Sequence, residues 1–226
     1  MNTFSKAVRP DGTDFHTGTV HWLPADGAPI PKGGWLVEHP KPGDVGIWDA
    51  AFYLSAATVE TDCTGFQWPG RLLSVEPVGD VWTPHPDSFP RKRAAHAWRV
   101  VGELPAWRLF GPQGRTVAAL IERTAHLTSA QMDGLAAAWP DTRPDALDAA
   151  WVAAWVAAPS AAWVAARVAA LDAVLVAARY AAWCAAQNAA WGAVLGWLAK
   201  DLISVEDFRA LTGPWTQVVG PIEVEV

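Results

Sequence analysis

The chain has 226 residues, of which 51% are apolar and 18% charged, and its formal net charge is -6. This composition excludes a disordered polymer, a collagen-like chain and a small disulfide-stabilised protein. Its most unusual features are 15 tryptophans against two tyrosines, and 43 alanines. Because an alanine removes little apolar area from water, the apolar fraction overstates the core that the chain can bury.

The cysteines and the charge balance indicate the compartment. Cys63 and Cys184 are too few for a disulfide framework or a four-cysteine zinc site, which favours reducing conditions. Residues 1–15 are polar and lack the apolar segment of a secretory signal. An acidic chain has no overall attraction for nucleic acid or anionic lipid. We therefore expect a cytoplasmic protein without a cofactor or a bound metal.

The composition changes near residue 113, and the part before it predicts short strands separated by turns such as Pro10-Asp11-Gly12. Ser55 is suited to N-cap a short helix through Ala56–Asp62. Residues 1–113 are thus expected to form a small, mostly antiparallel, β-rich α+β module. The expected strands are Lys6–Arg9, Thr19–Leu23, Gly34–His39, Ala51–Ser55, Arg71–Glu76, Ala97–Glu103 and Trp107–Phe110.

Residues 114–213 are expected to be helical. Thr128 with Gln131 three positions later is a capping-box pattern, and Pro140 predicts the end of that helix. Ser204 is a second expected N-cap, of a helix that Gly213-Pro214 would end. Residues 214–226 would then form a C-terminal tail.

A four-residue repeat, Ala-Ala-x-y, fills residues 149–196 and is the most specific pattern in the chain. Alanine has the highest helix propensity, so the repeat predicts α-helix. A four-residue step rotates about 40° beyond a full turn, so the bulky third position drifts around a straight helix. Pro159 predicts a break, and Gly192 and Gly196 are expected to weaken the far end. The expected fold class is therefore α+β, with an alanine-rich α-helical bundle after the β-rich module.

A basic cluster offers a nucleic-acid alternative. Arginines and lysine for phosphate contacts lie close in sequence to an aromatic ring for base stacking. The candidates are Arg91, Lys92, Arg93, Trp98 and Arg99. A charged loop leading into a strand explains the same residues, and this explanation is preferred on an acidic chain. Asp14, His16, His21, Glu38 and His39 have metal-ligand chemistry, but not the spacing of a known metal motif.

An enzyme alternative rests on Arg9, Ser55 and Glu103, which lie on or beside successive expected strands. Their order is that of arginine-serine-glutamate ADP-ribosyltransferases, which consume NAD. The arginine would hold a pyrophosphate, the serine would order the site, and the glutamate would stabilise an oxocarbenium-like state. Cys63 is a nucleophile only if a base lies nearby, and no local residue indicates one.

A membrane-active helical protein is a further alternative, because residues 149–166 and 180–199 carry no charge. Alanine is close to neutral for insertion, however, and the tryptophans are spread along these segments rather than gathered at their ends. Membrane insertion is therefore not the preferred interpretation.

Several short motifs occur in order over residues 6–110. They are Lys6-Ala7-Val8-Arg9, Asp14-Phe15 with Thr17-Gly18, Phe52-Tyr53-Leu54-Ser55, Arg71 to Glu76 with Gly79-Asp80-Val81, and Trp98 to Val101 with Glu103. This part resembles a family of uncharacterised bacteriophage and actinobacterial proteins that often carry an alanine-rich helical tail. The resemblance implies a phage origin and a location in the host cytoplasm, and it implies no activity.

The preferred hypothesis is a phage-type accessory protein that acts by binding. Its helical region would self-associate or dock on a host protein, because the repeat supplies more apolar helix surface than a short chain can cover. The candidate interaction residues are Trp151, Trp155, Trp163, Trp183, Trp191 and Trp197.

Overall fold

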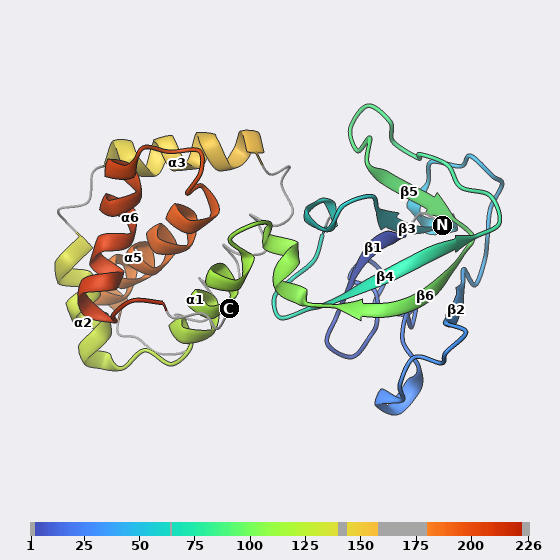
Figure 1. The fold of residues 1–226 in the computed structure, drawn as a ribbon, viewed down its shortest axis with the longest axis horizontal. Coiled ribbons are helices and arrows are strands. Elements are labelled where there is room, and N and C mark those ends of the chain that lie inside the picture. The colour runs from blue at the N-terminus through green and yellow to red at the C-terminus, as the bar shows by residue number, and fades with distance from the viewer. Residues whose placement is uncertain (1–2, 64, 140–143, 158–179, 223–226) are drawn as a thin grey trace. The chain divides into compact units, whose positions relative to one another are not determined.

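The computed structural model describes residues 3–63, 65–139, 144–157 and 180–222. The chain divides into two compact units, Met1–Leu109 and Phe110–Val226. The division lies slightly before the expected boundary at residue 113. Figure 1 shows strands in the first unit and helices in the second.

The first unit is built on a six-stranded sheet in which all neighbouring strands are antiparallel. Consecutive strands along the chain are seldom neighbours in this sheet, so the unit depends on pairings between distant segments. The α+β class and the antiparallel sheet are thus confirmed. The spatial order is β2 (Trp35–Glu38), β6 (Ala97–Leu104), β4 (Arg71–Val78), β1 (Phe4–Val8), β3 (Leu54–Ala57) and β5 (Lys92–Ala95) (Figure 1).

Alternation along β1 places Phe4 and Val8 on one face of the sheet. Val8 belongs to the core of this face together with Trp98 of β6, which is fully buried, and Phe4 packs against this core. The Phe4 and Trp98 rings meet edge to face with centroids 5.4 Å apart. The Trp98 indole N–H donates to the Leu54 carbonyl oxygen at 3.2 Å, which satisfies its polar atom.

Two of the expected strands are wrong. Residues 19–23 form only an isolated bridge between Thr13 and His21, because this segment belongs to a loop that folds back on itself. Residues 106–110 form a 3₁₀ helix rather than a strand. Strand β5 was not among the expected strands because its sequence, Lys92 to Ala95, has the composition of a basic loop.

The expected helix after Ser55 is also wrong, because Ser55 lies within β3. Ala57 pairs with Ser5 of β1, and Ser55 pairs with Ala94 of β5. These long-range pairings outweigh the local capping signal. Among the described residues between β3 and β4, the helical turn is the 3₁₀ helix Glu60–Asp62.

The second unit contains five described helices. The capping box of Thr128 and Gln131 is confirmed, and Ser204 caps the last helix as expected, with its side chain accepting the Asp207 N–H. Helices α2, α3 and α5 all pack against α6, and α1 packs against α5. The helices are α1 (Gly114–Thr124), α2 (Ser129–Ala138), α3 (Pro144–Ala157), α5 (Tyr180–Leu198) and α6 (Val205–Val218).

Helix α6 does not end at Gly213-Pro214 but continues to Val218, so residues 214–218 are helical rather than part of a tail. Proline in a helix interior removes a hydrogen bond and costs about 3 kcal/mol. Here Leu211 and Trp215 are almost fully buried on α6, and the packing of this face offsets that cost.

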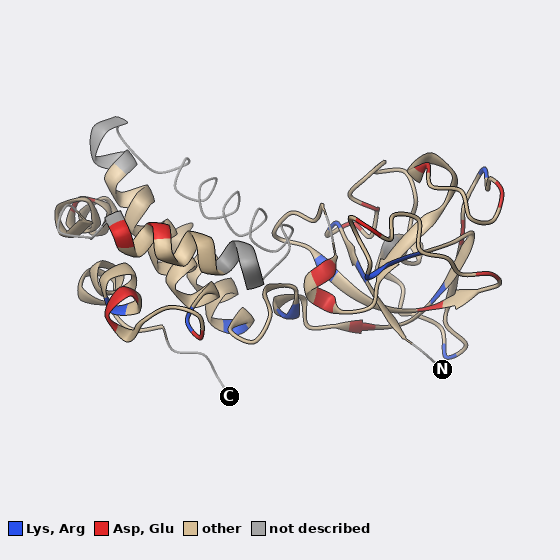
Figure 2. Cartoon of the chain, turned by 90° about the horizontal axis from the view of Figure 1, so that it is seen from above, with Lys and Arg blue, Asp and Glu red and all other residues tan. Residues whose placement is uncertain are grey.

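The repeat is described in part, as α3 up to Ala157 and α5 from Tyr180. Pro159, and the break expected there, lie outside the described residues. Helix α5 has no charged residue, and Figure 2 shows few charged residues along the helices. Within the described residues, no helix combines the length and hydropathy that are needed to cross a membrane.

Helix α5 continues through Gly192 and Gly196 to Leu198, and these glycines let neighbouring segments approach it closely. A Cβ on Gly192 would lie 2.5 Å from the Trp139 ring. A Cβ on Gly196 would lie 3.0 Å from Thr212 Cγ2 and 3.1 Å from Leu211 Cβ, both on α6. Alanine-rich helices with glycine at their contacts can pack at short interaxial distances, because no bulky side chain separates their backbones.

We expect Gly196→Ala to lower the free energy of unfolding by about 1–3 kcal/mol, because the added methyl group overpacks the contact between α5 and α6. Gly213→Ala is the matched control, since no atom outside its chain neighbours and its own helix backbone lies within 4 Å of the position of its Cβ. The helix propensity of alanine and its crowding against Pro214 oppose each other there, so the change is expected to stay below about 1 kcal/mol. Urea unfolding measures both variants. Equal stabilities of the two variants would contradict the close packing.

Candidate functional site

A cavity of about 400 Å³ lies in the first unit, beside the place where β1 and β3 separate. These strands pair at Ser5 and Ala57, the one register pair between them in the described structure. Past this pair, Lys6 and Ala7 of β1 and Leu54 and Ser55 of β3 line the cavity. A volume of a few hundred Å³ suits a small molecule.

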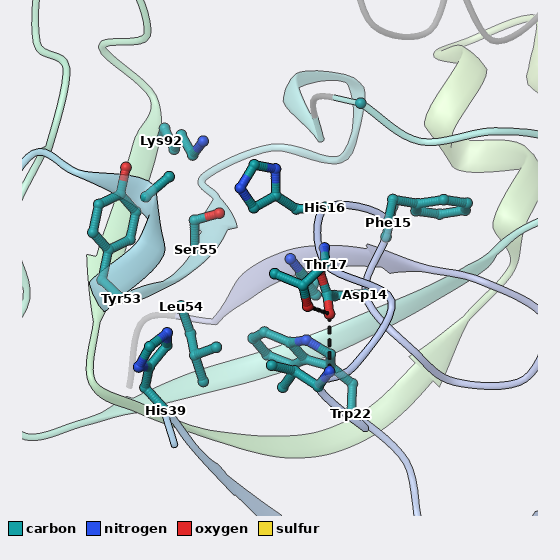
Figure 3. A pocket seen from close by; sticks show the side chains of 15 residues that line it. Asp14, Phe15, His16, Thr17, Trp22, His39, Tyr53, Leu54, Ser55 and Lys92 are labelled. Carbon is teal, nitrogen blue, oxygen red and sulfur yellow. Dashed lines mark hydrogen bonds between the residues drawn. The ribbon is translucent and has the colours of Figure 1, made fainter. Parts of the chain in front are cut away.

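The polar side chains of the cavity come from several elements. Figure 3 shows Lys92, Ser55 and His16 around the same space, with Tyr53 and His39 on one side and Asp14, Thr17 and Trp22 on another. Apolar groups of Phe15, Val20, Trp22 and Leu54 complete the wall. The cavity therefore combines charged, hydrogen-bonding and aromatic groups.

Asp14 organises the loop that forms one wall. Its carboxylate accepts hydrogen bonds from the Thr17 N–H at 2.6 Å, the Thr17 hydroxyl at 2.7 Å and the Val20 N–H at 3.0 Å. Burial alone would raise the pKa of Asp14, but these hydrogen bonds and the charge of Lys6 lower it to about 2. Asp14 is buried. Its carboxylate oxygens already accept hydrogen bonds from the loop, so Asp14 holds the shape of the cavity wall. Gly18, with φ +69°, completes the turn against the Arg9 guanidinium.

The two lysines of the cavity are half-buried. The Lys6 Nζ lies 4.7 Å from the centroid of the Trp22 ring, and the Lys92 Nζ lies 5.8 Å from that of Phe89. Burial, with a smaller contribution from the charge of Lys92, lowers the pKa of Lys6 to about 8, and the charge of Asp14 opposes this shift. Burial also lowers the pKa of Lys92. Neither amine forms an ion pair with a carboxylate in the described part of the chain.

His39 and Tyr53 supply neutral hydrogen-bonding groups. The Nδ1 of His39 accepts the Lys41 N–H at 3.1 Å, so the neutral ring carries its proton on Nε2. Burial lowers the pKa of His39 and raises that of Tyr53. Both side chains therefore remain neutral near pH 7, and neither adds charge to the cavity.

The residues of the enzyme alternative are not brought together. Ser55 lines the cavity on β3, whereas Glu103 lies on β6, and β1 and β4 separate these strands in the sheet. Glu103 pairs with Arg71 at 2.6 Å, and this bond lowers the pKa of its carboxyl. Arg9 packs against Gly18. The arrangement does not support an ADP-ribosyltransferase-like site.

The basic cluster does not form one surface either. Trp98 is fully buried, so its ring is not available for base stacking. Arg91 pairs with Asp62 at 3.3 Å, and Arg93 donates to the carbonyl oxygens of Pro90 and Lys92. Arg99 lies on a strand that does not pair with β5, and it donates to the Gly33 carbonyl oxygen. Of this set only Lys92 lines the cavity.

Cys63 is buried, and burial raises the pKa of its thiol to about 12. The thiol therefore remains protonated near pH 7 and is a poor nucleophile. It donates to the Ser5 carbonyl oxygen at 3.4 Å. No group of three or more histidine, cysteine or acidic side chains that could hold a metal ion occurs among the described residues.

The tryptophans of the repeat have different surroundings. Trp191 is buried within the helical unit, and Trp197 packs edge to face on Phe208 with centroids 5.2 Å apart. Trp151 is 36% exposed on α3. Trp163 lies outside the described residues, and of Trp155 and Trp183 only the helical backbone is described.

Comparison of the chain with protein-family models, with curated proteins and with solved structures finds no match. The cavity is therefore interpreted from its own geometry. Sequence reasoning included Lys92 only in a nucleic-acid surface and did not single out Lys6. The available signal was the position of Lys6 between Phe4 and Val8, where strand alternation predicts a core-facing side chain.

We expect Asp14→Asn to lower the free energy of unfolding at pH 7 by about 1–3 kcal/mol, because its amide group faces a hydrogen-bond donor. The folded-state pKa of Asp14, about 2, lies below the ordinary value of about 3.9. Its contribution is therefore present above about pH 4 and is lost as the pH falls toward 2. Urea unfolding between pH 7 and pH 2.5 measures both effects. The control is Asp87→Asn at an exposed position, and equal acid dependence of the Asp14 variant and the wild type would contradict the account.

Proposed function

We propose that the β-rich unit binds a small organic anion in the cavity beside β1 and β3. The observation that carries this proposal is the pair of half-buried amines, Lys6 and Lys92, which line the same cavity without a carboxylate partner in the described structure. The carboxylate of the wall, Asp14, already accepts three hydrogen bonds. Two ammonium groups and one carboxylate leave the cavity with a formal charge of +1.

The energetic argument is that a desolvated cation without a partner costs stability. Such a group is retained where it serves a function, and perturbed titratable groups accordingly cluster at functional sites. An anion that enters the cavity supplies the missing partner and forms charge-assisted hydrogen bonds with the amines.

The organic part of the ligand is favoured by the apolar wall. Trp22 is fully buried and lies against Lys6, while Phe15 and Leu54 line other parts of the same cavity. Ligand sites typically combine such apolar surface with a few placed polar groups. Ser55, Tyr53 and His39 provide these groups here.

Isothermal titration calorimetry with inorganic phosphate and with a phosphate monoester tests the proposal. Lys6→Met and Lys92→Met are each expected to weaken binding by about tenfold or more, since each removes a charged hydrogen bond. Lys41→Met, at an exposed position outside the cavity, is the matched control and should bind as the wild type does. Absence of binding, or equal weakening by all three substitutions, would overturn the proposal.

Lys6→Met is also expected to raise the free energy of unfolding at pH 7 without ligand, because an apolar side chain replaces a desolvated amine. The folded-state pKa of Lys6, about 8, lies below the ordinary lysine value of 10.5. The cost of the charge is therefore fully present below pH 8 and declines as the pH rises toward 10.5. Denaturant unfolding of both proteins at pH 7 and pH 10 measures the difference. A Lys6→Met protein that is less stable at pH 7 would show that the amine is a structural group.

Self-association through the helical unit is a second candidate function. Two adjacent apolar side chains on α3, Trp151 and Val152, are 36% and 61% exposed. Contact between two copies of the chain would cover them. The exposed pair supports the binding role expected from the repeat. The packing of α3 and α5 against α6 supports the proposal that the alanine-rich helices form a bundle. The phage origin, the host partner and the cytoplasmic location remain predictions.

Light scattering of the purified chain tests self-association. A dimer or larger assembly is expected, and Val152→Asp should shift it toward the monomer by placing a charge in the contact. Asp133→Lys, at an exposed position of α2, is a control for a charge change elsewhere in the helical unit and should leave the assembly intact. A wild-type chain that is monomeric at all concentrations measured would contradict this candidate.

A further inference from the structure

We propose that Lys6 forms a reversible imine with the carbonyl group of an anionic aldehyde or ketone bound in this cavity, while Lys92 holds the anionic group of the ligand. This inference rests on the anion-binding function proposed above and names the chemical class of the ligand. It assigns different roles to the two amines, and the position of each amine in the sheet supports its role.

Lys6 occupies a core-facing position of β1, in line with Phe4 and Val8. Its amine lies against the face of the Trp22 ring and reaches the cavity from a half-buried position. A nucleophilic lysine is one that is desolvated or lies next to another cation, because both effects increase the fraction of neutral amine. Lys6 meets the first condition, because it is desolvated beside the Trp22 ring, and burial is the largest cause of its lowered pKa.

Lys92 lies two strands away from β1, on the row of Ser5, the residue before Lys6. Ser5, the neighbour of Lys6, pairs with Ala57 of β3, and Ala57 pairs with Lys92 of β5. Two strand spacings place the backbones of β1 and β5 about 10 Å apart. Alternation turns Lys6 and Lys92 toward opposite faces of the sheet, but both line the cavity beside the place where β1 and β3 separate. A ligand of a few carbon atoms in this cavity can therefore have its carbonyl carbon at Lys6 and its phosphate or carboxylate at Lys92.

The charged and titratable groups that influence Lys6 come from three segments. Asp14 of the loop after β1 favours its protonated form, Lys92 of β5 opposes it, and the Cys63 thiol is protonated near pH 7. His16, Tyr53 and His39 line the same cavity. None of these supplies a second carboxylate that would hold Lys6 in its charged form.

The covalent step is balanced and requires no oxidant or reductant. The neutral Nζ of Lys6 adds to the carbonyl carbon, and the carbonyl oxygen takes up the proton that the nitrogen releases, giving a carbinolamine. Loss of one water molecule then forms the C=N bond, and water reverses the reaction. The Ser55 hydroxyl and the His16 imidazole line the cavity and can relay these protons (Figure 3).

Trapping with pyridoxal 5′-phosphate and sodium cyanoborohydride tests the inference. This probe carries an aldehyde and a phosphate, and the hydride converts an imine to a stable secondary amine whose position is read by peptide mass spectrometry. We expect Lys6 to be labelled at least tenfold faster than the exposed Lys32 and Lys41. The rate at Lys6 should level off near pH 8, while the rates at the exposed lysines continue to rise.

Two variants and one competing ligand test the separate roles of Lys6 and Lys92. Lys6→Arg should abolish the fast labelling, Lys92→Met should slow it by about tenfold, and inorganic phosphate should compete with the probe. Labelling of Lys6 no faster than that of Lys32 and Lys41 in the wild-type protein would overturn the inference without recourse to any variant.

Calorimetry with inorganic phosphate, which has no carbonyl group, separates the two proposals. If phosphate binds in a manner that depends on Lys6 and Lys92 but Lys6 is not labelled selectively, the imine is wrong and anion binding stands. If phosphate does not bind and Lys6 is not labelled selectively, both proposals are wrong.

Discussion

The first unit depends on the single pair that joins β1 and β3, Ser5 with Ala57. Beyond β3 the sheet continues to β5, where Lys92 pairs with the same Ala57 and lines the cavity. Past the Ser5 pair β1 and β3 separate, and the space between them is closed by a loop that Asp14 holds through three hydrogen bonds. A longer ladder between β1 and β3 would leave no room for the cavity. The charge of the cavity and its shape therefore have the same structural origin.

The helical unit meets a different constraint, because alanine supplies helix propensity but little apolar area. It gains packing by close approach, with Gly192 against Trp139 and Gly196 against Leu211 and Thr212. Bulky residues fill the remaining space, as the almost complete burial of Trp215 shows. The glycines in the repeat are thus part of the packing, although local propensity alone marks them as weak points of the helix.

Local signals predicted those elements whose residues bond to near neighbours, such as the capping box of Thr128 and Gln131. They failed where distant segments decide the conformation. Ser55 carries a capping signal, yet pairing with β5 makes it part of a strand. The cavity was beyond prediction for the same reason, since it requires the strand order that places β5 beside β3. Lys6 alone could have been found, from its core-facing place in an alternating strand.

The central claim is that Lys6 is a desolvated amine poised for an anion, and its own titration tests this most directly. Protein labelled with ¹³C-lysine allows the Lys6 Cε resonance, assigned with Lys6→Arg, to be followed against pH by NMR. The account predicts a pKa near 8 that rises when inorganic phosphate is added, because a bound anion stabilises the ammonium form. A pKa near the ordinary value of about 10.4 that phosphate leaves unchanged would contradict it.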